Sequence, residues 1–178
     1  EDVAGTDKLR KRATEKQENL KKWQIWSDAF AERLQEAMDA ESRTAAALAL
    51  RPPCLSDSIA TLTDVQDAIK LLKQQLKLQP DQALSKQAQD MADEYPADGY
   101  EEQLEEKLRW SEETQASTAK ALAAVEPLVA ALKRFVERSN LQSRRTVVEI
   151  KKRIDQIRSL DACHPEANRY EELVRRYS

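Results

Sequence analysis

The sequence predicts an all-α protein, and three observations lead to this fold class. Only two glycines occur among 178 residues, whereas a sheet protein of this size needs several for turns and close backbone approaches. Charged residues make up 34% of the chain, yet the apolar residues recur with helical periodicity, which distinguishes folded helices from a disordered chain. A Leu-Lys-basic-aromatic tetrapeptide also occurs twice, at 20–23 and 132–135. We therefore expect an elongated antiparallel three-helix bundle over residues 7–126, extended over residues 127–178 by a partial second helical unit or a C-terminal helical extension.

The first helix is expected from about residue 7, where Thr6 or Asp7 can cap exposed amides, to about residue 48. Its apolar positions predict one buried stripe, which Trp26 widens. The stripe comprises Leu20, Trp23, Phe30, Leu34 and Ala37. Pro52 and Pro53 then predict a loop, because consecutive prolines remove amide donors and disfavour helical geometry in the preceding residues.

The second helix has the clearest heptad pattern of the chain. Its seam consists of Leu62, Val65, Ile69, Leu72 and Leu76, which follow the 3-4-3-4 spacing of a coiled-coil stripe. Pro80 predicts a kink or short break near residues 79–81. A second apolar stripe follows with a changed phase at Leu84, Ala88, Met91 and Tyr95. The segment 95–99 is expected to be the turn into an antiparallel third helix.

The third helix is expected from about Tyr100 and ends before Pro127, since proline is disfavoured in a helix interior and tolerated in a first turn. Its predicted apolar positions are Leu104, Leu108, Trp110, Leu122 and Val125. From Leu128 a further helix could continue to about Leu160, although the pattern weakens at Ser139. A short last helix should begin at Pro165, and it either folds back on the preceding helix or belongs to a longer array.

The order of these elements resembles the spectrin-repeat family. The resemblance lies in Leu-Lys-Lys-Trp-Gln-Ile-Trp at 20–26, in the heptad segment 65–73, in the Pro-Ala-Asp-Gly turn at 96–99 and in the segment 104–110. It implies that Trp23 and Trp110 are core aromatics. It also implies a structural spacer and protein-docking module of a larger cytoskeletal or nuclear-envelope linker of the spectrin, dystrophin, plakin or nesprin kind. Such a module would be cytoplasmic and cytoskeleton-associated, or at the outer nuclear envelope, with cytoskeletal or actin-associated protein partners.

Charge segregation predicts two candidate partner-binding surfaces. The candidate basic surface comprises Arg144, Arg145, Lys151, Lys152 and Arg153, and the candidate acidic surface comprises Glu101, Glu102, Glu105 and Glu106. Such contrast can steer association, although alternating charge is also common on a solvated helical rod. The net charge of −3 gives no general case for nucleic acid binding. Two alternatives remain open, namely an adaptor whose groove receives a partner helix and a BAR-like dimer that binds membranes.

The sequence contains no motif that predicts catalysis or a cofactor. His164 is the only histidine, and its proximity to Cys163 is interpreted as a capping or loop position, since no zinc-type spacing is present. No nucleotide-binding loop or catalytic triad motif occurs, so we expect no enzymatic activity. Cys54 and Cys163 are expected to be free thiols in a reducing cytosol. No apolar run approaches the roughly 20 residues of a membrane-spanning helix.

Overall fold

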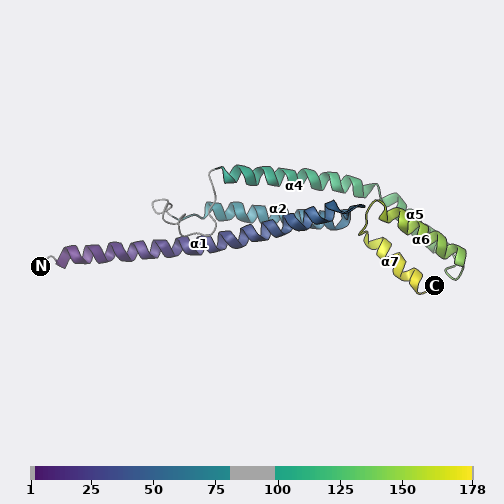
Figure 1. Ribbon diagram of the computed structural model, residues 1–178, viewed down its shortest axis with the longest axis horizontal. Helices are drawn as coiled ribbons and strands as arrows, with labels where there is room; N and C mark the ends of the chain where they lie inside the picture. Colours follow the sequence, from purple (N-terminus) through teal and green to yellow (C-terminus); the bar gives the residue numbers. More distant parts are fainter. Residues whose placement is uncertain (1–2, 81–98, 178) are drawn as a thin grey trace. The chain divides into compact units, whose positions relative to one another are not determined.

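The computed structural model describes residues 3–80 and 99–177, and every regular element in these ranges is a helix (Figure 1). Helices α1 (Val3–Ala49), α2 (Leu55–Lys77) and α4 (Tyr100–Ala123) correspond to the three predicted long helices. They are followed by α5 (Glu126–Glu137), α6 (Arg144–Arg158) and α7 (Pro165–Arg175). The predicted all-α class is confirmed. None of the described helices is long and apolar enough to cross a membrane.

The chain divides into two compact units whose limits run through the long helices. Unit 1 contains residues 1–38 and 67–108, and unit 2 contains residues 39–66 and 109–178. Each unit therefore takes one part of α1, α2 and α4, whereas the sequence suggested a boundary near Pro127. A change of helix does occur there, because α4 ends at Ala123 and Pro127 lies in the first turn of α5.

Unit 1 is held together by an aromatic cluster on the predicted stripe of α1. The ring centroids of Trp23 and Trp26 are 5.6 Å apart, those of Trp26 and Phe30 are 5.2 Å apart, and those of Phe30 and Tyr100 of α4 are 5.8 Å apart. The indole Nε1 of Trp26 donates a hydrogen bond of 2.7 Å to the carbonyl of Gln75 in α2. The predicted burial of Trp23, Trp26 and Phe30 is confirmed, and this cluster ties both neighbouring helices to α1.

Unit 2 has its own apolar core, to which the C-terminal helices contribute most of the side chains. The 3-4-3 pattern of α6 places Val147, Ile150, Ile154 and Ile157 in this core, against α5 on one side and α7 on the other. Helix α7 contributes Tyr170, and its N-cap is His164, whose Nδ1 accepts a hydrogen bond of 3.2 Å from the Glu166 amide. The interpretation of His164 as a capping residue is confirmed. Of the two alternatives for the last helix, the structure shows the first, because α7 folds back on α6.

A loop clasp joins the α1–α2 loop to the α6–α7 loop within unit 2. Cys54 and Cys163 form a disulfide, so the prediction of free thiols was wrong. Beside it, Asp161 is fully buried and accepts hydrogen bonds from the Leu55 amide at 2.9 Å, from the Ser56 hydroxyl and from the Cys163 amide at 3.2 Å. The disulfide and the Asp161 hydrogen bonds together constitute the loop clasp. The Asp161 carboxylate thus caps the amino end of α2 from 106 positions away in the sequence.

The Asp161 hydrogen bonds are expected to contribute measurably to stability. Asp161→Ala should lower the free energy of unfolding by about 1–3 kcal/mol, because the buried Leu55 amide loses its acceptor. Chemical denaturation followed by circular dichroism measures this loss. The exposed Asp155→Ala on α6 is the matched control and should change stability by less than about 0.5 kcal/mol. Equal stability of the two variants would contradict the role assigned to Asp161.

Two further predictions were wrong, and each error has a structural reason. The helix expected from Leu128 to Leu160 is two helices, because the chain turns between α5 and α6. There the Ser139 hydroxyl donates to the Phe135 carbonyl, and the Asn140 side chain accepts from the Gln142 amide at 3.0 Å. Trp110 is not a core aromatic, since 48% of its surface is exposed.

The true buried seam of α4 explains the exposure of Trp110. Steps of four and three from Leu104 lead to Leu108 and then to Ser111, which is fully buried, so that Trp110 lies off the seam. The seam continues through Gln115, Thr118 and Leu122, and the buried Val125 follows just beyond the end of α4. The second apolar stripe predicted after Pro80 lies outside the described residues; it comprises Leu84, Ala88, Met91 and Tyr95. Helix α2 ends at Lys77, ahead of Pro80.

Candidate docking surfaces

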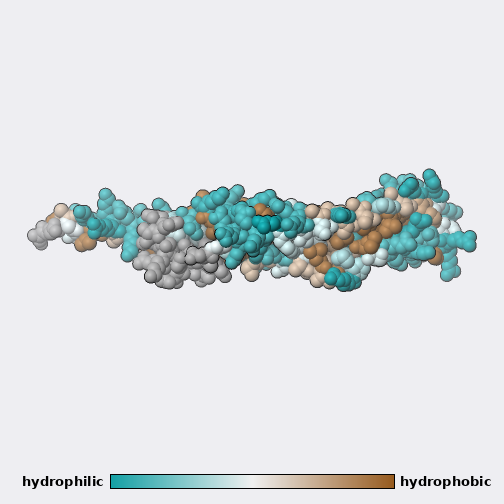
Figure 2. Space-filling view, turned by 90° about the horizontal axis from the view of Figure 1, so that it is seen from above, coloured by the Kyte–Doolittle hydropathy of each residue, from teal (hydrophilic) through white to brown (hydrophobic). Residues whose placement is uncertain are grey.

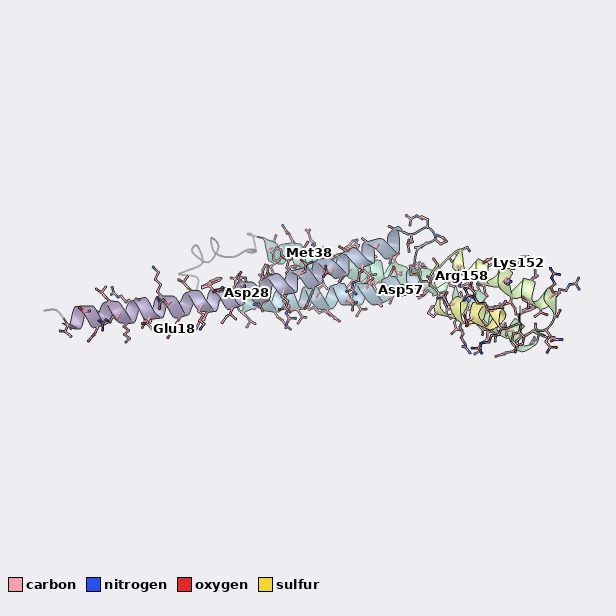
Figure 3. The ribbon with its side chains drawn as sticks, turned by 60° about the horizontal axis from the view of Figure 1, so that its bottom comes forward. Glu18, Asp28, Met38, Asp57, Lys152 and Arg158 are labelled. Carbon is pink, nitrogen blue, oxygen red and sulfur yellow. A yellow bond between two sulfur atoms is a disulfide. The ribbon has the colours of Figure 1, made fainter. Side chains whose placement is uncertain are left out.

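The predicted basic surface lies on α6, and four of its five side chains point to solvent. Arg144, Arg145, Lys151 and Lys152 are exposed, and none of the four forms an ion pair with a carboxylate in the described part of the chain. They lie three or four positions to either side of Val148, a side chain with 61% of its surface exposed. Figure 3 labels Lys152, which points away from the helix. We call Val148 and these four cations the basic face.

Arg153, the fifth predicted residue, is used inside unit 2. Its guanidinium carbon lies 4.7 Å from the centroid of the Phe135 ring on α5, and its Nε is 3.2 Å from a carboxylate oxygen of Glu149. These contacts hold the side chain against the α5–α6 pair through a cation–π interaction and an ion pair one turn apart. Arg153 therefore supports packing of the two helices and is not part of the exposed basic face.

The predicted acidic surface lies on the first turns of α4. Glu101, Glu102, Glu105 and Glu106 are all exposed, and acids at this end of a helix interact favourably with its dipole. Glu105 forms an ion pair with Lys73 of α2, which gives it a structural role within unit 1. The other three carboxylates extend from α4 into solvent.

The exposed Trp110 lies on the same stripe of α4 as three acidic residues. The place of Trp110 on this exposed stripe was not predicted from the sequence. Glu102, Glu106, Trp110 and Glu113 follow one another in steps of four, four and three, and all four are exposed. We call them the acidic face. A heptad register drawn through Leu104 and Leu108 was the signal that could have placed Trp110 outside the core, but the resemblance to the spectrin-repeat family implied a core aromatic at this position.

A shallow groove between α6 and α7 borders the basic face. It has a volume of about 290 Å³, with Ile154 and Val174 among its lining residues. The Arg158 side chain crosses to α7, where it donates to Asn168 at 2.8 Å and pairs with Glu171 (Figure 3). The hydrogen bond from Arg158 and its positive charge hold the pKa of Glu171 below its ordinary value.

The Arg158–Glu171 pair predicts an acid-dependent loss of stability. Because the pKa of Glu171 is lower in the folded chain than in the unfolded chain, the pair stabilises the fold at neutral pH, and this contribution disappears as the pH falls through the folded pKa. Glu171→Gln should therefore reduce the difference in unfolding free energy between about pH 7 and about pH 3. Denaturant titrations at both values measure it. Glu172→Gln, one position along α7, is the control, and an equal effect of both variants would contradict the assignment.

Unit 1 presents an apolar depression of about 480 Å³ beside the indole of Trp26. Ile25 and Leu78, which line it from α1 and from the end of α2, are 63% and 68% exposed. Exposed aliphatic side chains around a depression are typical of a surface that accepts an apolar side chain. This depression is the feature that corresponds to the predicted adaptor groove.

One group of potential metal ligands occurs among the described residues. Ligand atoms of Cys54, Asp57 and Cys163 lie within 4.8 Å of one another. The two sulfur atoms form the disulfide of the loop clasp, and metal binding by cysteine requires thiolates. The group is therefore not a metal site while the disulfide is intact.

The fold and these surfaces define an all-helical protein with charged, solvent-exposed helix faces. Figure 2 illustrates this character, since hydrophilic residues cover most of the side in view and hydrophobic residues gather toward the right-hand end. Comparison with known proteins adds no family, because no family model, curated protein or solved structure matches the chain.

Proposed function

We propose that the chain is a non-enzymatic structural spacer and protein-docking module of a larger linker protein, built on a spectrin-repeat-like three-helix bundle with a further helical unit. The observation that carries the spacer role is α1, which continues without interruption for 47 residues. At a rise of 1.5 Å per residue such a helix spans about 70 Å. A compact globule of 178 residues has a radius of gyration of only about 16 Å. A continuous helix of this length suits a protein that holds its neighbours apart.

Small-angle X-ray scattering of the chain tests the spacer role. We expect a radius of gyration well above about 16 Å and a maximum dimension of at least the length of α1, about 70 Å. The measurement should be repeated over a dilution series, so that association between chains is separated from elongation of one chain. A radius of gyration near 16 Å at infinite dilution would refute the spacer proposal.

The docking role is supported by the basic face of α6. Its four cations are exposed and take no part in ion pairs within the described chain, whereas Arg153 and Arg158 on the same helix are engaged inside unit 2. Cations at an interface rim mainly steer encounter and select partners. A cluster of them around an exposed apolar side chain suits the binding of an acidic protein partner.

The disulfide changes the compartment in which we expect this module to act. Disulfides persist in oxidising compartments and are rare in the cytosol, so the cytoplasmic, cytoskeletal setting that the resemblance implied is the less favoured one. We propose an oxidising compartment such as the lumen bounded by the nuclear envelope. Alkylation of free thiols in intact cells, before and after reduction, tests this: both cysteines should react only after reduction. If both cysteines reacted without reduction, the thiols would be free, and a cytosolic location would be favoured instead.

The adaptor alternative is supported by the apolar depression in unit 1. Exposed Ile25 and Leu78 would be covered by the apolar side of a partner helix. A photo-crosslinking residue at position 25 should then capture this partner in an assembled complex, while the same residue at Met38, which is also exposed on α1, should not. Equal crosslinking at the two positions would refute a specific groove.

A further inference from the structure

The basic face of α6 has the composition of one half of a binding surface. Its centre is apolar, since Val148 has 61% of its surface exposed. Its rim is cationic, because Arg144 and Arg145 lie one turn before this valine and Lys151 and Lys152 one turn after it. In many interfaces the apolar centre contributes most of the binding energy, and the charged rim around it contributes specificity.

The acidic face of α4 has the complementary composition. Its centre is Trp110, with 48% of its surface exposed, and tryptophan is among the residues that most often dominate binding energy. Glu106 lies one turn before this indole and Glu113 one turn after it, while the other two positions three or four residues away hold Lys107 and Thr114. The charges of the two helices also match in number. The α4 segment 100–113 contains six acidic and two basic residues, whereas α6 contains six basic and two acidic residues.

We propose that the acidic face of α4 in one copy of this chain binds the basic face of α6 in a second copy. Trp110 packs against Val148, and the carboxylates of Glu106 and Glu113 pair with the surrounding cations. Because the acidic face of one copy binds the different, basic face of the next, the contact is head-to-tail. Such contacts generate closed rings or open chains of copies. The proposal names the partner of the docking surface described above, and it therefore rests on the proposed docking function.

The physical chemistry of this contact sets its expected behaviour. Exposed ion pairs contribute little each and are screened by salt, so most of the affinity comes from desolvation of the indole. Association should weaken as the salt concentration rises from about 50 mM to about 500 mM. Trp110→Ala should raise the dissociation constant about 30-fold, the effect of losing an interface residue worth about 2 kcal/mol.

A charge-swap experiment tests the pairing directly. One variant reverses the acidic face (Glu106→Lys with Glu113→Lys), and another reverses the basic face (Lys151→Glu with Lys152→Glu). Each variant alone should sediment as a single chain in analytical ultracentrifugation. Reversal of the acidic face sets cations against the unchanged basic face, and Lys151→Glu with Lys152→Glu leaves only Arg144 and Arg145 as cations, so that the basic face loses its net charge. An equimolar mixture should associate again, as should a chain that carries all four substitutions. The matched control for the basic-face variant is Lys133→Glu with Arg134→Glu, two exposed cations of α5. It changes the net charge by the same amount as that variant and should associate like the wild type.

The possible outcomes separate this proposal from the others. Association that is lost in both variants and not restored in the mixture would overturn the α4–α6 pairing. A wild-type chain that stays single at every salt concentration would overturn self-association, while the scattering test of the spacer role would be unaffected. Cosedimentation of the wild type with vesicles of anionic phospholipid, lost in Lys151→Glu with Lys152→Glu and retained in Trp110→Ala, would assign the basic face to a membrane instead. Cooperative circular dichroism melting of every variant confirms that folding is intact.

Discussion

Replacing Cys163 with serine should lower the free energy of unfolding by about 2–5 kcal/mol. The disulfide joins residues separated by 109 positions, and it therefore removes a large part of the conformational freedom of the unfolded chain. The entropic estimate for closing a loop of about 100 residues is about 4.7 kcal/mol, near the upper end of this range. Few single substitutions in this chain should have a larger effect.

Chemical denaturation of the wild type with and without a dithiol reductant provides the reference for this measurement. Reduced wild type and Cys163→Ser should unfold at nearly the same denaturant concentration, well below that of the oxidised wild type. Cys54→Ser combined with Cys163→Ser should resemble the single variant, apart from the effect at the buried Cys54. If reduction leaves the midpoint of the wild type unchanged, the disulfide does not stabilise the fold.

Replacing Trp26 with alanine should cost about 3–5 kcal/mol, the usual range for removing a large aromatic side chain from a core. The side chain is 4% exposed, stacks on Phe30 and donates from Nε1 to the Gln75 carbonyl. Trp26→Phe retains part of the apolar contact and removes the donor, so its cost should be smaller but still measurable. Thermal and chemical unfolding measure both losses.

Trp110→Ala is the matched control for this prediction, because it removes the same side chain from an exposed position. It should lower the unfolding free energy by only about 1 kcal/mol, because about half of the Trp110 surface is exposed and half burial of a large apolar side chain contributes about that much. If the two alanine variants destabilise the chain equally, the assignment of Trp26 to the core and of Trp110 to the surface must be wrong.

Much of the helical core could be predicted because helix burial follows local spacing. The stripe through Trp23 and Phe30 and the seam from Leu62 to Leu72 are buried as expected, since residues three and four positions apart share a helix face whatever the partner is. The same rule places Trp110 at the surface, because the heptad register through Leu104 and Leu108 leads to Ser111, whereas the family resemblance implied a core position for Trp110. The exposed cations of α6 were likewise predictable, because a charged residue opposite an apolar stripe faces solvent.

The candidate surfaces were predicted less completely, because local spacing does not reveal which charges a neighbouring helix will engage. Arg153 belongs to the same basic run as Lys151 and Lys152, yet its side chain packs over Phe135. Glu105 similarly pairs with Lys73 of α2. Whether a charged side chain is available to a partner depends on which helix lies beside it, and that depends on tertiary packing.

The sequence by itself determined the all-α class, most of the helix limits and the aromatic core of α1, since these depend on glycine content, proline positions and helical periodicity. Only the tertiary structure decided the pairing of Cys54 with Cys163 and the capping of α2 by Asp161. Both involve residues more than 100 positions apart, in two loops without periodicity. Their contact follows from where the ends of packed helices meet, and no local spacing in the sequence encodes that position.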